Sequence, residues 1–108
     1  HAQIIAMNNP SGMVIDSNSN FLYVADTGFH RVIRIDLSSN QADVVAGNGT
    51  CNPNASGDGA AATSAALCAP TNLGLDISRN LVINESGRNA IRLVSFTNSN
   101  LGNQLSFS

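Results

Sequence analysis

The chain has 108 residues and a formal net charge of -2, only 11% of its residues are charged, and none of them is lysine. This length allows one small domain and makes a second domain unexpected. Because the sequence offers no basic field to hold a phosphate backbone or an anionic lipid, nucleic acid and membrane surfaces are excluded as expected partners. No apolar run reaches the length of a bilayer span, so we expect a soluble chain without membrane insertion, either processed or cut from a longer protein.

Short extended segments are predicted in the first half of the chain. β-branched residues dominate them, and turns rich in Asn, Ser and Gly separate them. The segment "FLYVA" is apolar on both faces, which for a strand of this length indicates that both faces of its sheet are covered. Residues 3–7 resemble residues 43–47 in length and position, and they are a candidate outer strand of a neighbouring unit. The predicted strands are 12–16, 21–26, 31–37 and 42–46.

A long loop, residues 48–69, follows these segments and contains both cysteines of the chain, Cys51 and Cys68. Zinc needs more ligands than two cysteines supply, and neither His1 nor His30 stands at the spacing of a metal site. A disulfide between the two cysteines is therefore favoured, and closing a loop of this size would contribute about 3 kcal/mol. The alternative is a pair of free thiols in a reducing compartment.

Three N-x-[ST] tripeptides begin at Asn48, Asn54 and Asn84. This tripeptide is the acceptor for N-linked sugar, although it is short enough to occur by chance in a chain rich in Asn. Three matches beside a predicted disulfide, in a chain without lysine, favour a secreted or cell-surface glycoprotein that carries N-glycans.

The second half of the chain repeats the first. "PSGMVIDSNSN", residues 10–20, recurs as "PTNLGLDISRN", residues 70–80, and "FLYVADTGFHRVIRI" then recurs as "LVINESGRNAIRLV" with one residue deleted. Between the copies, residues 59–67 ("GAAATSAAL") have the only helical propensity in the chain and are expected to form a short covering turn. The predicted strands of the second copy are 73–77, 81–85 and 90–96.

The fold class follows from this repeat of small sheets with two apolar faces. A single sandwich of so few strands could not cover both faces of each sheet, whereas four-stranded antiparallel sheets stacked around an axis would cover them. We therefore predict an all-β fold made of two β-propeller blades, with a short helical turn in the loop between them. The first blade covers about residues 10–47 with the linker 48–69, and the second covers about residues 70–108, where the tail 101–108 alternates like a half-buried edge strand.

These residues resemble the NHL-repeat propeller family over most of the chain, roughly residues 3–96. The matching motifs are "PSGMVID", "LYVADTGFHRVIRID" and, in the linker, "VVAGNGT" and "SGDGAAATSAALCAP". The second copy departs from the pattern, because it lacks the equivalent of Tyr23, replaces Asp26 by Glu85 and replaces Arg31 by Ala90. Some proteins similar to this family are lyases that use metal-bound His with Tyr and Arg, and others bind RNA.

The polar side chains that could act in catalysis or bind a metal are better explained by structural roles. In "DTGFHR" we expect Asp26 to hydrogen-bond turn amides, and His30 and Arg31 to lie on a blade edge, although a ligand or general base is the functional alternative for His30. Asp16 and Asp76 close equivalent strands, which indicates turn building. The single Gly-Asp-Gly turn supplies too few oxygens for calcium. We expect no catalytic residue, metal or cofactor.

Two blades alone form a wedge whose two outer faces lack a neighbour. The chain is therefore expected to be part of a larger propeller, or a protomer that associates with itself into a ring or a filament. Our prediction is a non-enzymatic extracellular segment that serves self-assembly, or ligand or protein binding. The alternative is a fragment of a secreted, metal-dependent lyase-like enzyme whose catalytic residues lie outside this chain. An RNA-binding propeller is disfavoured by the missing lysine and the three tripeptides.

Overall fold

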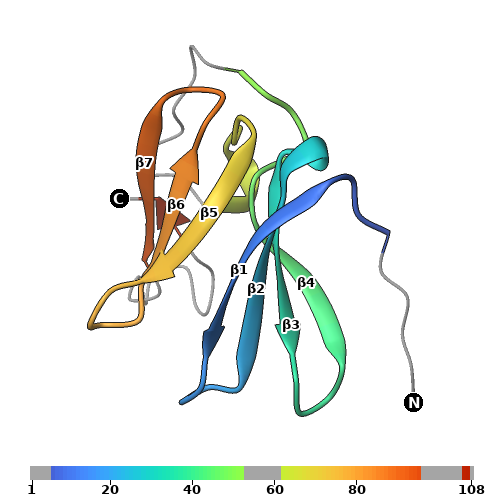
Figure 1. Cartoon of the computed structure of the whole chain (residues 1–108), viewed down its shortest axis with the longest axis vertical. Helices are drawn as coiled ribbons and strands as arrows, with labels where there is room; N and C mark the ends of the chain where they lie inside the picture. Colours follow the sequence, from blue (N-terminus) through green and yellow to red (C-terminus); the bar gives the residue numbers. More distant parts are fainter. Residues whose placement is uncertain (1–5, 53–61, 96–105, 108) are drawn as a thin grey trace.

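The computed structural model describes residues 6–52, 62–95 and 106–107. Within them, two four-stranded antiparallel sheets follow one another along the chain, with strand orders β1-β2-β3-β4 and β5-β6-β7-β8. The two sheets pack face to face, at an angle to each other (Figure 1). This arrangement confirms the predicted all-β fold class and is that of two consecutive propeller blades.

The strands of the two sheets have closely similar bounds in the two copies of the repeat. Two 3-10 turns accompany them, η1 (Thr27–Phe29) after β2 and η2 (Ala62–Ser64) in the linker. The turn η2 falls within the stretch 59–67 for which a helical turn was predicted. The strands are β1 (Pro10–Asp16), β2 (Phe21–Asp26), β3 (Arg31–Asp36), β4 (Gln41–Ala46), β5 (Pro70–Leu75), β6 (Leu81–Glu85), β7 (Ala90–Ser95) and β8 (Ser106–Phe107).

Strands β1 and β5 begin earlier than predicted, each at a proline. Proline lacks an N–H, and the first residue of a strand is one of the few positions in a sheet that tolerates this. The ladder then shifts register between Pro10 and Gly12, and again between Pro70 and Asn72. The same irregularity therefore opens both sheets, which is a structural sign of the repeat.

Aspartates build the turns that end three of the strands. Asp16, Asp36 and Asp76 each accept a hydrogen bond from the backbone N–H two residues further on, at 3.1, 2.9 and 2.9 Å. Such a side-chain turn competes with the ladder and stops the strand. The turn-building role predicted for Asp16 and Asp76 is thus confirmed, and it explains why β5 ends two residues before the predicted end at 77.

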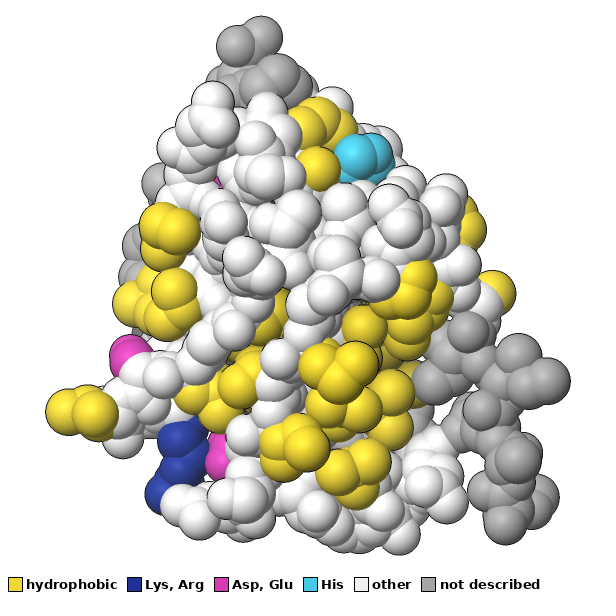
Figure 2. All heavy atoms as spheres, viewed as in Figure 1, with side chains coloured by type: hydrophobic (Ala, Val, Ile, Leu, Met, Phe, Trp, Pro, Cys, Tyr) yellow, Lys and Arg dark blue, Asp and Glu magenta, His cyan; other side chains and the backbone are white. Residues whose placement is uncertain are grey.

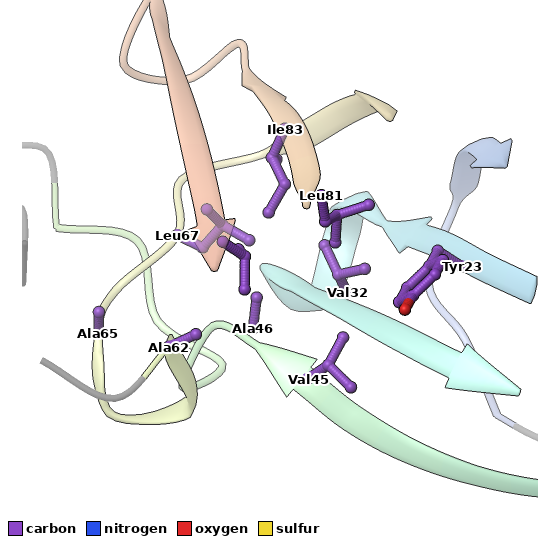
Figure 3. Close-up of a cluster of buried hydrophobic side chains, with 10 residues drawn as sticks. Tyr23, Val32, Val45, Ala46, Ala62, Ala65, Leu67, Leu81 and Ile83 are labelled. Atoms are coloured by element: carbon purple, nitrogen blue, oxygen red, sulfur yellow. The ribbon is translucent and has the colours of Figure 1, made fainter. Parts of the chain in front are cut away.

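The hydrophobic core lies between the two sheets and is closed on one side by the linker (Figure 3). Leu81 and Ile83 of β6 point toward Val32 of β3, and small alanines of the linker fill the remaining space. Each fully buried Val, Leu or Ile contributes about 1.5–3 kcal/mol. The buried cluster consists of Tyr23, Val32, Val45 and Ala46 from the first sheet, Ala62, Ala65 and Leu67 from the linker, and Leu81, Ile83 and Val94 from the second sheet.

In the part of the chain that the structure describes, no helix has the length and apolar character needed to cross a bilayer.

Candidate functional site

A buried carboxylate clamps the segment that leads into the first sheet. Asp26 ends β2, is fully buried, and accepts hydrogen bonds from Nε of Arg31 and from the backbone N–H of Asn8, both at 2.7 Å. The N–H of Gly28 closes the clamp by donating to the carbonyl oxygen of Asn8 at 2.7 Å. The backbone amide that Asp26 binds thus belongs to the segment before β1, in place of the expected turn amides.

The second sheet repeats this clamp with different side chains. Glu85, also fully buried, accepts from the backbone N–H of Cys68 at 2.6 Å, and the N–H of Gly87 donates to the carbonyl oxygen of Cys68 at 3.0 Å. The missing Arg31 equivalent is compensated by two other arginines, since Nε of Arg88 lies 2.9 Å and Nη1 of Arg92 lies 3.3 Å from the Glu85 carboxylate. The position of the acid is therefore retained although the residue types differ.

A disulfide ties the linker to the second clamp. Cys51 and Cys68 are bonded through their sulfur atoms, and their Cα atoms lie 4.3 Å apart. Nη2 of Arg88 also donates to the carbonyl oxygen of Asn52 at 2.7 Å. Both ends of the linker are thus held next to Glu85, which fixes where β5 begins.

Hydrogen bonds cross from side chains of the first sheet to the backbone that opens the second. The hydroxyl of Thr27 donates to the carbonyl oxygen of Pro70 at 2.6 Å, and the N–H of Ala69 donates to Nδ1 of His30 at 3.1 Å. The hydroxyl of Ser11 donates to the carbonyl oxygen of Thr71 at 3.0 Å. His30 therefore joins the two sheets, which the sequence alone did not reveal.

One face of the first sheet carries apolar side chains that lie outside the cluster between the sheets, and two of them, Val24 and Ile33, are themselves buried. The strand registers place seven large apolar side chains on this face, beside Ala42 and the Asp26–Arg31 pair, and none of the seven belongs to the buried cluster between the sheets. Figure 2 shows hydrophobic side chains gathered over the strands of the first sheet. Three of the seven are substantially exposed, Met13 at 67%, Ile15 at 57% and Val44 at 37%. We call this the open apolar face, and it consists of Met13, Ile15, Leu22, Val24, Ile33, Ile35 and Val44.

The second sheet has an outer face of mixed polarity on the side away from the core. Asn72, Asn84 and Ile91 are cross-strand neighbours on this face, and Ile91 is 68% exposed. Gly74, Val82 and Leu93 form the next row. We call these six residues the far face.

The repeat relates the two uncovered faces to the buried contact between the sheets. Aligning the copies places the open apolar face of the first sheet over the face of the second sheet that carries Leu81 and Ile83. The far face corresponds in the same way to the face of the first sheet that carries Tyr23 and Val32. Within the chain, the Tyr23 face of the first sheet packs against the Leu81 face of the second sheet. The far face and the open apolar face are the repeat equivalents of these two faces, so each could make the same kind of contact with another blade.

A recess lies at the seam, between the β1–β2 turn and the β5–β6 turn. Its volume is about 230 Å³, and its lining comprises Asp16, Ser19, Phe21, Tyr23, Ser78 and Arg79. The Asp16 side chain is only 7% exposed, and Nε of Arg79, on a half-exposed side chain, lies 3.8 Å from its Oδ1. Burial raises the pKa of Tyr23, so the side chain with which this residue lines the recess stays a neutral phenol. The recess thus combines opposite charges, hydroxyls and aromatic rings.

The remaining predicted site residues lie apart from one another. Asn48 is exposed directly after β4, and Asn84 lies within β6 on the far face. The third asparagine, Asn54, is outside the described residues. Among the residues that are described, no group of three or more His, Cys, Asp or Glu side chains is arranged to hold a metal ion.

Comparison with known proteins identifies the repeat. Residues 7–35 match the family model of the NHL repeat, and they run from just before β1 to the penultimate residue of β3. A 45-residue stretch is 42% identical to Protein SUPPRESSOR OF QUENCHING 1, chloroplastic, of Arabidopsis thaliana, and it covers 42% of this chain but 4% of that protein. Residues 7–35 therefore form an NHL repeat, which confirms the family resemblance for this part of the chain.

Proposed function

We propose that this chain is a non-enzymatic scaffold segment of an extracellular NHL-type propeller, and that further blades cover its two uncovered faces. The blades come either from the rest of a longer chain or from other copies that associate into a ring or a filament. The observation that carries the proposal is the equivalence of the open apolar face to a face that is already buried in this molecule.

Burial of this face would supply the driving force for assembly. Apolar surface gains about 25 cal/mol for each Å² removed from water, and Met13, Ile15 and Val44 still expose much of theirs. Because the open apolar face and the far face lie on opposite sides of the wedge, the contact is head to tail. A head-to-tail contact gives a ring if its rotation closes and a filament if it does not.

Native molecular mass tests the scaffold proposal. We expect the purified chain to form a defined ring or filament in mass photometry. Ile15→Asp should abolish this assembly, because it places a charge in the contact made by the open apolar face. Ile77→Asp is the matched control, because Ile77 is fully exposed in the β5–β6 turn and lies outside both faces. A wild-type chain that stays a stable, well-folded monomer at high concentration would overturn the association of copies into a ring or a filament.

The extracellular part of the proposal is supported by the disulfide and by the exposed Asn48 tripeptide. Intact mass of the native protein before and after glycosidase treatment tests it, and we expect a loss of sugar mass. The name of the Arabidopsis relative places that protein in the chloroplast. A plastid location of this chain with unmodified asparagines would overturn this part.

A second candidate function, binding of a small ligand, is favoured by the recess at Asp16. This nearly buried carboxylate accepts one hydrogen bond, at 3.1 Å from the N–H of Asn18, whereas Asp76 accepts three. A buried carboxylate favours further donors. An anionic ligand would be repelled by Asp16, and a cationic ligand would be repelled by Arg79 beside it. The recess therefore favours a neutral ligand with several hydroxyls.

Chemical shift perturbation with a panel of neutral monosaccharides tests this second function. We expect shifts at Ser19, Ser78 and Arg79, and their loss in Asp16→Asn. Asp36→Asn is the control, since Asp36 closes its turn in the same way but lies away from the recess. Shifts scattered over other surfaces, or none with any sugar, would remove ligand binding as a function of the recess.

A further inference from the structure

Asn48 has the geometry of an accessible acceptor. Its Oδ1 accepts hydrogen bonds from the backbone N–H of Thr50 at 3.0 Å and from the Thr50 hydroxyl at 2.6 Å. The flanking Gly47 and Gly49 both have φ of 88°, and a Cβ on Gly49 would meet no atom within 4 Å. The tripeptide is therefore folded on itself at the exposed surface, with the amide oxygen engaged and no described residue hydrogen-bonded to the amide nitrogen.

Asn84 has the opposite surroundings. It lies inside β6, partly buried on the far face between Asn72 and Ile91. The hydroxyl of Ser86, the third residue of its tripeptide, donates to the carbonyl oxygen of Ala69 at 2.9 Å. The residue between them, Glu85, is the buried clamp carboxylate. Because the backbone of this tripeptide is paired on both sides within the sheet, we expect a transferase to use it only after β6 has opened locally.

We propose that Asn48 is the sugar acceptor of the folded chain and that Asn84 is a structural asparagine that stays unmodified. In the transfer, the amide nitrogen of Asn48 forms a bond to the anomeric carbon of a sugar activated as a diphosphate. The bond from that carbon to the diphosphate oxygen breaks, the diphosphate leaves with the electron pair, and a base takes one amide proton. The physiological use of this site rests on the extracellular location proposed above.

The choice between the two asparagines bears on assembly. A sugar on Asn84 would stand on the far face, which the scaffold proposal assigns to the next blade. A sugar on Asn48 projects from the turn after β4, outside both the open apolar face and the far face. Glycosylation at Asn48 is therefore compatible with blade stacking, whereas glycosylation at Asn84 is not.

The test uses folded, purified chain, a soluble asparagine transferase and UDP-glucose as the sugar donor, with peptide mapping by mass spectrometry. Asn54→Gln serves as the background, so that the third tripeptide does not contribute. We expect glucose on Asn48, and modification of Asn84 slower by more than about tenfold, since it requires local opening of the sheet. Denaturation and reduction should bring the two rates together.

Two variants complete the experiment. Asn84→Gln should leave the rate at Asn48 unchanged, and Thr50→Ser should retain modification because the hydroxyl is kept. Equal rates at Asn48 and Asn84 in the folded chain, or an unmodified Asn48, would overturn the inference. A native protein without sugar would instead refute the proposed location, and it would leave the result of this assay unchanged.

Discussion

The backbones of Asn8 and Cys68 make the same pair of hydrogen bonds in the two sheets, although the two side chains are chemically different. Each donates its N–H to a buried carboxylate, Asp26 or Glu85, and each accepts at its carbonyl oxygen from the glycine two residues after that carboxylate. Both stand two residues before the proline that opens their sheet. The clamp is thus a property of the repeat, and the side chains around it are free to vary.

Truncating the clamp carboxylates should destabilise the chain unequally. Glu85→Ala removes the buried carboxylate that Arg88 and Arg92 contact, so we expect a loss of about 3–5 kcal/mol in the free energy of unfolding. Asp26→Ala should cost less, because the side chain of Arg31 is 26% exposed and regains water. Urea unfolding measures both values. A smaller loss for Glu85→Ala than for Asp26→Ala would contradict this account.

The clamp glycines should not tolerate a methyl group. A Cβ on Gly28 would collide with Asn8, and a Cβ on Gly87 would collide with Cys68. We expect Gly87→Ala to lower the free energy of unfolding by about 1–3 kcal/mol through overpacking. Gly74→Ala is the control, since a Cβ there meets no atom within 4 Å. Thermal unfolding should separate the two variants clearly, and similar melting temperatures would refute the crowding argument.

The sequence predicted the sheets well and their connections poorly, for a physical reason. Strand positions follow from local patterns, namely short apolar runs that end at an acidic residue, so β2, which ends at Asp26, and β6, which ends at Glu85, have their predicted bounds. Clamp contacts join residues far apart in sequence, such as Cys68 and Glu85, and leave no periodic signal. The one available signal was the acid, hydroxyl, glycine triplet that both copies share at Asp26 and Glu85.

The arginines show the same limit. The second copy has Ala90 in place of Arg31, yet Arg88 and Arg92 pair with its acid from other positions. Arg92 stands where the first sheet has Ile33, on a neighbouring strand. Only the register of β6 against β7 shows that such a replacement reaches Glu85.

Opening the disulfide should lower stability without changing the fold. The bridge closes a loop with a sequence separation of 17, so we expect reduction to cost about 3 kcal/mol in the free energy of unfolding. Denaturant melts with and without reductant measure the loss. The double variant Cys51→Ser and Cys68→Ser is the control, because reductant should leave it unaffected. A melt of the wild-type chain that does not respond to reductant would show that the bridge does not stabilise the chain.

Acid should disrupt the β5–β6 turn only at low pH. The N–H of Asn80, and secondarily its side-chain amide and the N–H of Ser78, hold the pKa of Asp76 below its ordinary value of 3.8. A depressed folded pKa means that the stabilisation is complete above 3.8 and is lost as pH falls through the folded value. Carboxyl carbon NMR measures the pKa directly. Asp76→Asn should remove this acid-dependent component, and a titration at or above 3.8 would contradict the hydrogen-bond assignment.

The bond between His30 and Ala69 should couple the two sheets. Nδ1 of His30 accepts from the N–H of Ala69, and His30 itself has φ of 54°, a conformation that glycine adopts readily. His30→Gly therefore removes the bond while it relieves the backbone, and we expect a loss of about 1–3 kcal/mol from leaving the Ala69 N–H unpaired. Hydrogen exchange of the Ala69 amide should accelerate in this variant, while the amides inside β2 and β3 keep their protection. His30→Asn is the paired control, because asparagine also tolerates this conformation and keeps an acceptor. If Ala69 exchanges at the wild-type rate in His30→Gly, the imidazole does not hold the seam, and Thr27 and Ser11 carry the connection between the sheets.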